Sequence, residues 1–329
     1  MSVVIVYVLF ILGFFFLIYG ADWLVDGASS LARRMQISDL VIGLTIVSFG
    51  TSAPELAVNV IASFDGKASL AISNILGSNV ANIMLVLGAS ALVRPLLIQK
   101  NTTWKEIPLS ILAGVLLAVL LNDVLVDNSG TNVLSRGDGF VLSAFFIIFM
   151  YYTFSLVSGG EQELSESDSE EHGTEIPVWR AIVMSVAGLI ALPVGGNWIV
   201  DGAVQIAQDI GLSESVIGVV IVGVGTSLPE LAASVMAAYK GKTDIAVGNA
   251  VGSNIFNIFW VLGLSAMIRP LPFDIQMNAD LMMVITASVL LFAFTLIGKN
   301  RRELSRGEGM LFLLGYAAYL IYLFTFHRT

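Results

Sequence analysis

Cysteine, histidine and charge are all scarce in this chain of 329 residues. It has no cysteine, which excludes disulfides and cysteine-ligated metal sites. The two histidines, His172 and His327, fall in a polar stretch and close to the C-terminal end. A histidine-based catalytic or metal site in the apolar part of the chain is therefore excluded.

Charged residues make up only 12% of the chain, whereas hydrophobic residues make up 56%. A soluble domain has about 25% charged residues, so the composition indicates an integral membrane protein. Much of the net charge of −9 comes from one acidic stretch at 161–175, and no basic surface suggests nucleic acid as a partner. The first apolar run follows no cationic segment and precedes no small-residue cleavage site, so we expect a retained spanning helix.

Apolar runs bounded by polar clusters predict an all-α protein with ten transmembrane helices. The expected spans are Val3–Ala32, Ile37–Phe64, Ser69–Val93, Ile107–Val126, Gly139–Val157, Val178–Ala207, Val216–Tyr239, Ile245–Ile268, Ala279–Ile297 and Gly309–Phe326. An acidic linker at 158–177 separates residues 1–157, with the first five spans, from residues 178–329, with the last five. The linker's composition is typical of a solvated tether.

Lysine and arginine are distributed unevenly between the two sets of loops. The side of the central linker has about twelve of them: Arg33, Arg34, Arg94, Lys100, Lys105, Arg180, Lys240, Lys242, Lys299, Arg301, Arg302 and Arg306. The other side has about four: Lys67, Arg136, Arg269 and Arg328. The positive-inside rule thus predicts a cytoplasmic linker, with both termini outside.

The two halves of the chain repeat each other at a constant offset of 175 residues. Between Gly20 and Leu96, about 39 of 77 positions are identical to those 175 residues later. The segments GTSAPELA and GSNVANI return as GTSLPELA and GSNIFNI. Each half has five expected spans, an odd number, so the second half must enter the membrane from the opposite side. Inverted repeats are typical of secondary transporters, whose substrate site lies near the midplane.

Glu55 and Glu230 are matching carboxylates well inside their expected spans. A charge at that depth costs at least ~2.5 kcal/mol, and no lysine or arginine is expected inside a span to offset it. Two such carboxylates repel each other and take up protons unless a cation joins them. Ca²⁺ prefers six to eight oxygen ligands that include carboxylates, so the pair predicts a Ca²⁺ site.

Further oxygens surround each glutamate. Pro54 and Pro229 directly precede the glutamates and should free the carbonyls of Gly50 and Gly225, because proline lacks an N–H. Unwound backbone at membrane depth is tolerated where it lines a cavity. Hydroxyl ligands are expected from Thr51, Ser52, Thr226 and Ser227. A simple packing kink is the alternative.

The third and eighth spans contain polar residues at helical spacing, which places them on one face. The residues nearest mid-span are Ser78, Asn82, Ser253 and Asn257, and we expect them to line the site. Asn74 and Asn249 lie one turn earlier. Hydrogen bonding between helices is the competing explanation for any one of them.

Asp22, Asp26 and Asp201 follow long apolar runs in the first and sixth spans. We expect them to reach the membrane interface beside Trp23 and Trp198, because tryptophan and polar residues mark the ends of spanning helices.

At GTSAPE, GTSLPE and the two GSNxxNI runs, the chain resembles the cation/calcium exchanger superfamily, and most closely its prokaryotic Na⁺/Ca²⁺ exchanger branch. The resemblance covers nearly the whole chain and implies a multi-pass protein of the prokaryotic cell membrane. It implies that Glu55 and Glu230 bind Ca²⁺ and help to bind Na⁺, with oxygens from the two Thr-Ser pairs. It further implies that Ser78 and Ser253 line Na⁺ sites, and that the backbone carbonyls of Ser48 and Gly223 contribute.

The resemblance predicts a Na⁺/Ca²⁺ antiporter with no cofactor, in which the first and sixth spans slide across the rest. Some members of the superfamily, including potassium-dependent exchangers, have aspartate at the position of Asn257. Both matching positions here, Asn82 and Asn257, are neutral, which weakens the case for K⁺ dependence. Related H⁺/Ca²⁺ exchangers usually have Asn-Ala in place of the Thr-Ser-x-Pro run, although glutamates can exchange protons and H⁺ coupling stays open.

Three alternatives remain at this point. An antiporter of H⁺ and Ca²⁺, or of another divalent ion, keeps the same site. An intramembrane hydrolase would use paired acids of which one is protonated, whereas the oxygen-rich motif favours ion coordination. A passive channel usually surrounds its pore with several subunits, whereas one chain here contains both half-sites, so that a monomer suffices.

Overall fold

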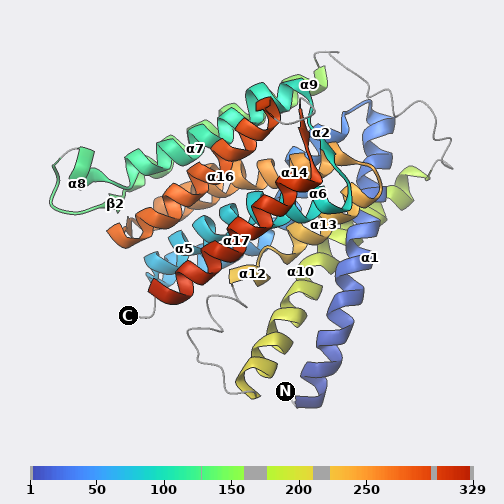
Figure 1. Cartoon of the computed structure of the whole chain (residues 1–329), viewed down its shortest axis with the longest axis horizontal. Helices are drawn as coiled ribbons and strands as arrows, with labels where there is room; N and C mark the ends of the chain where they lie inside the picture. Colours follow the sequence, from blue (N-terminus) through green and yellow to red (C-terminus); the bar gives the residue numbers. More distant parts are fainter. Residues whose placement is uncertain (1–2, 127, 159–175, 210–222, 298–301, 327–329) are drawn as a thin grey trace.

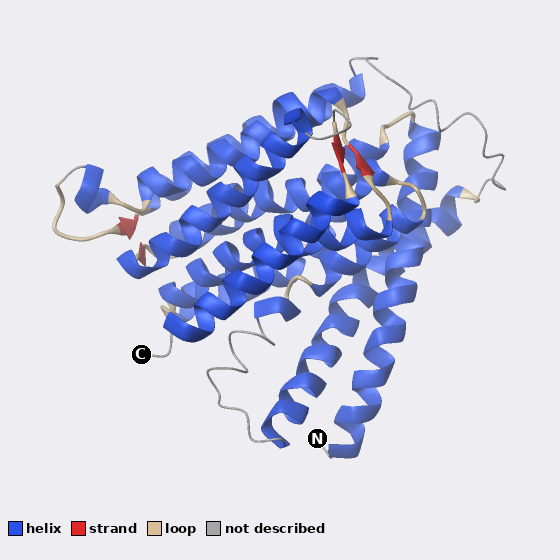
Figure 2. Cartoon of the chain, viewed as in Figure 1, coloured by secondary structure: helices blue, strands red, loops and turns tan. Residues whose placement is uncertain are grey.

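The computed structural model describes residues 3–126, 128–158, 176–209, 223–297 and 302–326, and these are almost entirely helical (Figures 1 and 2). Most of the acidic linker and the first part of the expected seventh span lie outside the described residues. The elements are α1 (Val3–Met35), α2 (Asp39–Ile42), η1 (Gly43–Val47), α3 (Ser48–Thr51), α4 (Ala53–Asp65), α5 (Ala68–Ala81), η2 (Asn82–Leu87), α6 (Gly88–Val93), β1 (Leu96–Leu97), η3 (Thr102–Glu106), α7 (Ile107–Leu120), α8 (Asp123–Val126), β2 (Val133–Leu134), α9 (Arg136–Ser158), α10 (Val178–Asp209), α12 (Gly223–Gly225), α13 (Leu228–Tyr239), α14 (Thr243–Phe256), η6 (Asn257–Leu262), α15 (Gly263–Ile268), β3 (Leu271–Pro272), η7 (Ile275–Met277), α16 (Asn278–Ile297), β4 (Glu303–Leu304) and α17 (Arg306–Phe326).

Within the described residues, eight helices are long and apolar enough to cross a membrane. A ninth span results if the bent pair Asp39–Thr51 and Ala53–Asp65 is counted as one. The protein is therefore an all-helical membrane protein. The expected seventh span, Val216–Tyr239, contributes only its second part, α12 and α13, to the described structure.

One expected span is wrong at both ends. The fourth was expected at Ile107–Val126, but the helix runs over Thr102–Leu120 and α8 is a separate short helix. The first residues of this helix, η3, are polar and form a π-helical turn with Thr102, Thr103 and Glu106 buried. These polar residues are buried against other parts of the protein, so the helix can begin before the apolar run. Hydropathy along the sequence gives no information about such burial.

The helices α1 and α10 lie side by side over their length and together form an arm beside the other helices (Figure 1). Their contact is lined by glycines seven residues apart: Gly13, Gly20, Gly27, Gly188, Gly195 and Gly202. A Cβ at Gly195 would lie 2.7 Å from the carbonyl oxygen of Gly13. Small residues let helix backbones approach closely, which is how helices associate in lipid.

The helices α5 and α14 form the centre of the remaining bundle. In each of these spans, 78% of the most apolar window is buried, compared with 17% for α1. Each continues through a π-helical turn that begins at an asparagine, Asn82 in η2 and Asn257 in η6. π-Helical turns often occur at functional sites because they re-aim side chains out of the regular helix.

Two short strand pairs join segments from different halves of the chain. The strand β1 pairs antiparallel with β4, and β2 pairs antiparallel with β3. Nearby, the guanidinium of Arg94 lies beside Gly241, and that of Arg269 lies beside Gly66. Both glycines have positive φ, +79° and +76°, which favours glycine. These reciprocal contacts hold the loop after α13 and the loop after α4 against the bundle.

Candidate functional site

Two helix breaks place the paired glutamates. Ser52 (φ −83°, ψ 6°) separates α3 from α4, with a bend of 47°, and Ser227 (φ −89°, ψ 4°) precedes α13. Pro54 and Pro229 lie in the first turn of the following helices, where a missing N–H costs nothing. The glutamates lie in the same first turns, where the helix dipole stabilises negative charge.

Both carboxylates are buried, with Glu55 0% and Glu230 1% exposed. No ion pair in the described part of the chain involves either glutamate. The Oε2 atom of each is buried without a hydrogen-bond partner. A buried carboxylate oxygen in this situation needs a proton or a cation, because burial of an unpaired charge is costly.

Glu230 is surrounded by residues of the first half of the chain as well as its own. The hydroxyl of Ser52 donates to Glu230 Oε1 at 3.0 Å and lies 3.0 Å from Ser253 Oγ. The hydroxyl of Thr51 donates to Asn249 Oδ1 at 3.1 Å, and the Asn249 amide donates to the backbone carbonyl of Glu230 at 3.3 Å. The broken helix of one half is thus joined to the glutamate of the other.

Glu55 also lies among hydroxyls of both halves, but its hydrogen bonds differ from those of Glu230. The hydroxyl of Ser78 donates to Glu55 Oε1 at 3.2 Å and lies 3.4 Å from Thr226 Oγ1. Ser227, which matches Ser52 in the repeat, is buried but its hydroxyl has no partner. The Ser227 oxygen is therefore available to a ligand, whereas that of Ser52 already bonds a carboxylate.

Four asparagines join α5 to α14 beside the glutamates. The side chain of Asn82 donates to Asn254 Oδ1 at 3.1 Å, and that of Asn257 donates to Asn79 Oδ1 at 3.0 Å. The Oδ1 atoms of Asn82 and Asn257 are buried without a partner. The amide nitrogens of Asn82 and Asn257 thus form the interhelical hydrogen bonds that were the competing explanation, and the role of their oxygens in lining a site stays a prediction.

The backbone carbonyls of Ser48 and Gly223, the two expected backbone ligands, lie at different places in their helices. The carbonyl oxygen of Ser48 accepts the backbone N–H of Ser52 at 3.0 Å, and the Ser48 side chain is buried. Gly223 is the first residue of α12. The role of both carbonyls as ion ligands stays a prediction.

Sequence reasoning missed Asn79 and Asn254, which join the two central helices beside the glutamates. Asn79 and Asn254 also donate to each other's backbone carbonyls, at 3.3 and 3.2 Å. A signal was present, because the third residue of GSN is asparagine in both repeats. Pairing across the repeat axis depends on how α5 and α14 cross, which spacing along one helix does not reveal.

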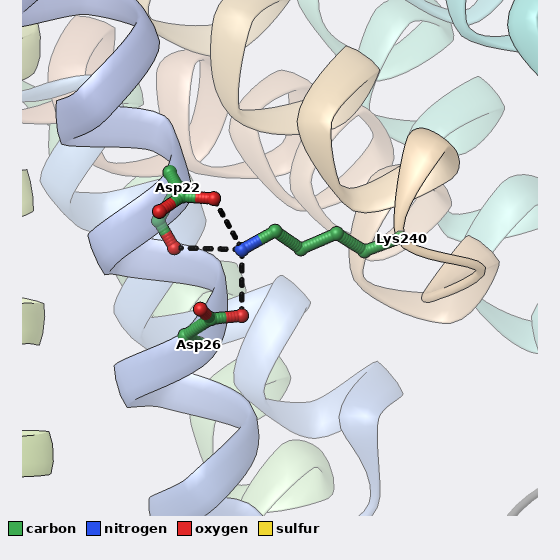
Figure 3. Close-up of polar contacts among 3 residues, drawn as sticks. All are labelled: Asp22, Asp26 and Lys240. Carbon is green, nitrogen blue, oxygen red and sulfur yellow. Dashed lines mark hydrogen bonds and ion pairs between the residues drawn. The ribbon is translucent and has the colours of Figure 1, made fainter. Parts of the chain in front are cut away.

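The position of Asp22 and Asp26 at the membrane interface stays a prediction, whereas helix-end polarity does not explain them. The helix α1 continues to Met35, so neither aspartate marks its end. Both aspartates form ion pairs with the ammonium of Lys240, whose Nζ lies 2.6 Å from Asp22 Oδ1 and 2.6 Å from Asp26 Oδ1 (Figure 3). Lys240 is the C-cap residue of α13, and it reaches α1 across a contact that the sequence does not predict.

The site therefore brings together two carboxyl groups, hydroxyls and amide oxygens. Within the described ranges, no three His, Cys, Asp or Glu side chains cluster to hold a metal. A site with few charges and many neutral oxygens binds hard cations and can release them again, since its affinity is set by ligand charge and rigidity. Fold and site together define a membrane protein in which two buried carboxyl groups lie beside helix breaks among uncharged oxygens.

Comparison with known proteins agrees with this class. The family model described as sodium/calcium exchanger protein matches residues 5–155 and 180–325. The CaxA protein of Alkalimonas amylolytica is 41% identical over 96% of this chain and 97% of its own length. The sodium/calcium exchanger MaX1 of Methanosarcina acetivorans is 30% identical over 97% of this chain and 98% of its own length.

Solved structures give the same result. The sodium-calcium exchanger NCX_Mj, soaked with zero Na⁺ and Ca²⁺, superposes with a TM-score of 0.81 and 34% sequence identity, covering 98% of this chain and 100% of that one. The chain belongs to the sodium/calcium exchanger protein family.

Proposed function

We propose that this protein is a secondary transporter that exchanges Na⁺ for Ca²⁺ across a membrane. The observation that carries the proposal is the pair of buried glutamates, each with one partnerless carboxylate oxygen and neither with a basic partner among the described residues. Its relatives MaX1 and NCX_Mj, which are named as sodium/calcium exchangers, support the choice of ions. An exchanger moves ions and forms no covalent bond, so this protein is not an enzyme.

The proposed site uses oxygens from both halves. Glu55 and Glu230 provide the charge, and Ca²⁺ and Na⁺ compete for them, which couples the two fluxes. The hydroxyls of the site come from Thr51, Ser52, Thr226, Ser227, Ser78 and Ser253, the amide oxygens from Asn82 and Asn257, and the backbone carbonyls from Ser48 and Gly223. The free oxygens of Ser227, Asn82 and Asn257 support this set.

The proposed architecture is ten transmembrane helices in two inverted repeats, residues 1–157 and 178–329, joined by the linker at 158–177. The reciprocal strand pairs and the reciprocal Arg-Gly contacts support it. The linker is cytoplasmic and both termini are outside, in the cell membrane of a prokaryote. A single chain contains both half-sites, so a monomer is sufficient, and the site alternates between the two sides of the membrane.

The test is Ca²⁺ uptake into proteoliposomes loaded with Na⁺, K⁺ or choline, with and without a pH gradient. Uptake that needs the outward Na⁺ gradient supports Na⁺ coupling, and Glu55→Gln should abolish it. Glu106→Gln is the matched control and should leave uptake unchanged, because Glu106 is equally buried and also has a partnerless Oε2 but lies in η3, away from the two helix breaks.

Uptake that ignores Na⁺ and follows the pH gradient would establish the H⁺/Ca²⁺ alternative with the same site. H⁺/Ca²⁺ exchange is the second candidate because the partnerless Oε2 atoms of Glu55 and Glu230 can bind protons as well as cations. Absence of Ca²⁺ flux under every gradient would overturn the ion assignment.

A further inference from the structure

The contact of Lys240 with α1 is a strong polar link between the α1–α10 arm and the bundle. The ammonium of Lys240 has three acceptors: Asp22 Oδ1 and Asp26 Oδ1, each at 2.6 Å, and the Asp22 backbone carbonyl at 3.2 Å (Figure 3). These use all three N–H donors of the group. The Lys240 side chain is 20% exposed, whereas those of Asp22 and Asp26 are 38% and 40% exposed, so water screens the ion pair in part.

The bundle end of this link is firmly held. Lys240 is the C-cap of α13, and the next residue, Gly241, packs against the guanidinium of Arg94. The first turn of the same helix contains Glu230, roughly 15 Å away at 1.5 Å per residue. One short helix therefore connects the proposed ion site to the contact with α1.

The arm also touches the bundle at the broken helices. A Cβ at Gly50 would collide with Leu189 of α10, and one at Gly225 would collide with Val200. These contacts are apolar and can slide, because van der Waals attraction has no strong directional preference. The ion pair is directional, and it must break if α1 moves along α13.

The residues that form this ion pair are not repeated in the other half of the chain. At the offset of 175, Asp22 and Asp26 correspond to Asn197 and Asp201, and Lys240 corresponds to Asp65. Asp65 instead pairs with Lys67 in its own loop, at 3.3 Å. The other repeat thus has an aspartate at the position of Lys240, and an asparagine and an aspartate at the positions of Asp22 and Asp26, so it lacks the residues for a matching ion pair.

We propose that Lys240 is a positioning residue that biases the α1–α10 arm toward the conformation seen here by holding Asp22 and Asp26 against the end of α13. The inference rests on the proposed alternating access, in which the arm and the bundle change their relative position. An attraction present in only one of two otherwise matched states shifts their populations by its full differential free energy. The two directions of transport are therefore unequal in this protein.

The test measures the position of the arm directly. The chain has no cysteine, so spin labels on Ile18→Cys in α1 and Ile147→Cys in α9, both exposed positions, report one distance distribution. The distribution should have one peak for the conformation seen here and a second peak for the moved arm. Lys240→Met should raise the population of the second peak about five-fold, and Lys240→Arg should leave the ratio of the two peaks as in the wild type. Asp22→Asn with Asp26→Asn should act like Lys240→Met, and adding Lys240→Met to that pair should produce little further change.

Lys67→Met is the matched control, because it removes a lysine from the corresponding loop of the first repeat without touching α1. Equal distance distributions for Lys240→Met, Lys67→Met and wild type would overturn the proposal. A lowered melting temperature without a changed ratio would also overturn it, since that is the result of a purely structural ion pair. Ca²⁺ flux by the wild type is measured separately, so failure of the transport proposal is distinguishable.

Discussion

The two halves of the site differ in the hydrogen bonding of one serine hydroxyl. Ser52 and Ser227 match in the repeat, yet Ser52 donates to Glu230 whereas Ser227 has no partner. The same residue type therefore has two tasks: one hydroxyl orients a carboxylate, and the other is left for a ligand. Glycine and proline beside them give the two breaks almost the same backbone angles.

Substitution of Ser52 and Ser227 by alanine should affect stability and Ca²⁺ binding separately. Ser52→Ala removes a hydrogen bond to a carboxylate, worth about 1.5–3 kcal/mol, and should lower the melting temperature of the ion-free protein. Ser227→Ala should leave that temperature unchanged but weaken Ca²⁺ binding about ten-fold. Thermal melts with and without Ca²⁺ measure both effects, and unchanged Ca²⁺ affinity in Ser227→Ala would remove Ser227 from the ligand set.

Helix packing in this protein depends on close backbone approach. The α1–α10 arm is joined by glycines that would each bring a Cβ within about 3 Å of the partner helix. Because lipid is as apolar as leucine, the arm gains little from hydrophobic burial and relies on van der Waals contact. The glycine spacing of seven was visible in the sequence, whereas the identity of the partner helix was not.

Gly195→Ala should destabilise the arm. Its Cβ would lie 2.7 Å from a backbone oxygen that cannot turn aside, at a cost of about 1–3 kcal/mol. Gly77→Ala is the control, because a Cβ there meets nothing within 4 Å and alanine favours the helix by up to about 1 kcal/mol. Melting in detergent compares them, and equal melting temperatures would refute close packing as the basis of the arm.

Across the whole molecule, each glutamate is surrounded by residues from both halves of one chain. If one chain is a complete transporter, two inactive variants cannot rescue each other. Vesicles that contain a mixture of Glu55→Gln and Glu230→Gln proteins should show no Na⁺-driven Ca²⁺ uptake. Recovery of about a quarter of the wild-type rate would instead mean that two chains build one site.

The orientation of the whole molecule can be read with single cysteines, because the natural chain has none. Ser129 and Lys100 are both exposed, in loops that the positive-inside rule places on opposite sides. A membrane-impermeant maleimide should label Ser129→Cys on intact cells and Lys100→Cys only after permeabilisation. The reverse pattern would invert the topology while leaving the site unchanged.

The sequence alone determined the membrane class and the repeat, and it predicted that Glu55 and Glu230 are buried, because hydropathy, identity at a fixed offset and the position of a charge within an apolar run are properties of the chain itself. It also located most spans, although the fourth was misplaced because buried polar residues at Thr102 and Thr103 continue the helix. Tertiary structure decided which groups meet: Asn79 with Asn257, Ser52 with Glu230, and Lys240 with Asp22 and Asp26. Those pairings depend on how helices far apart in the chain cross, and periodicity within one helix contains no information about its neighbour.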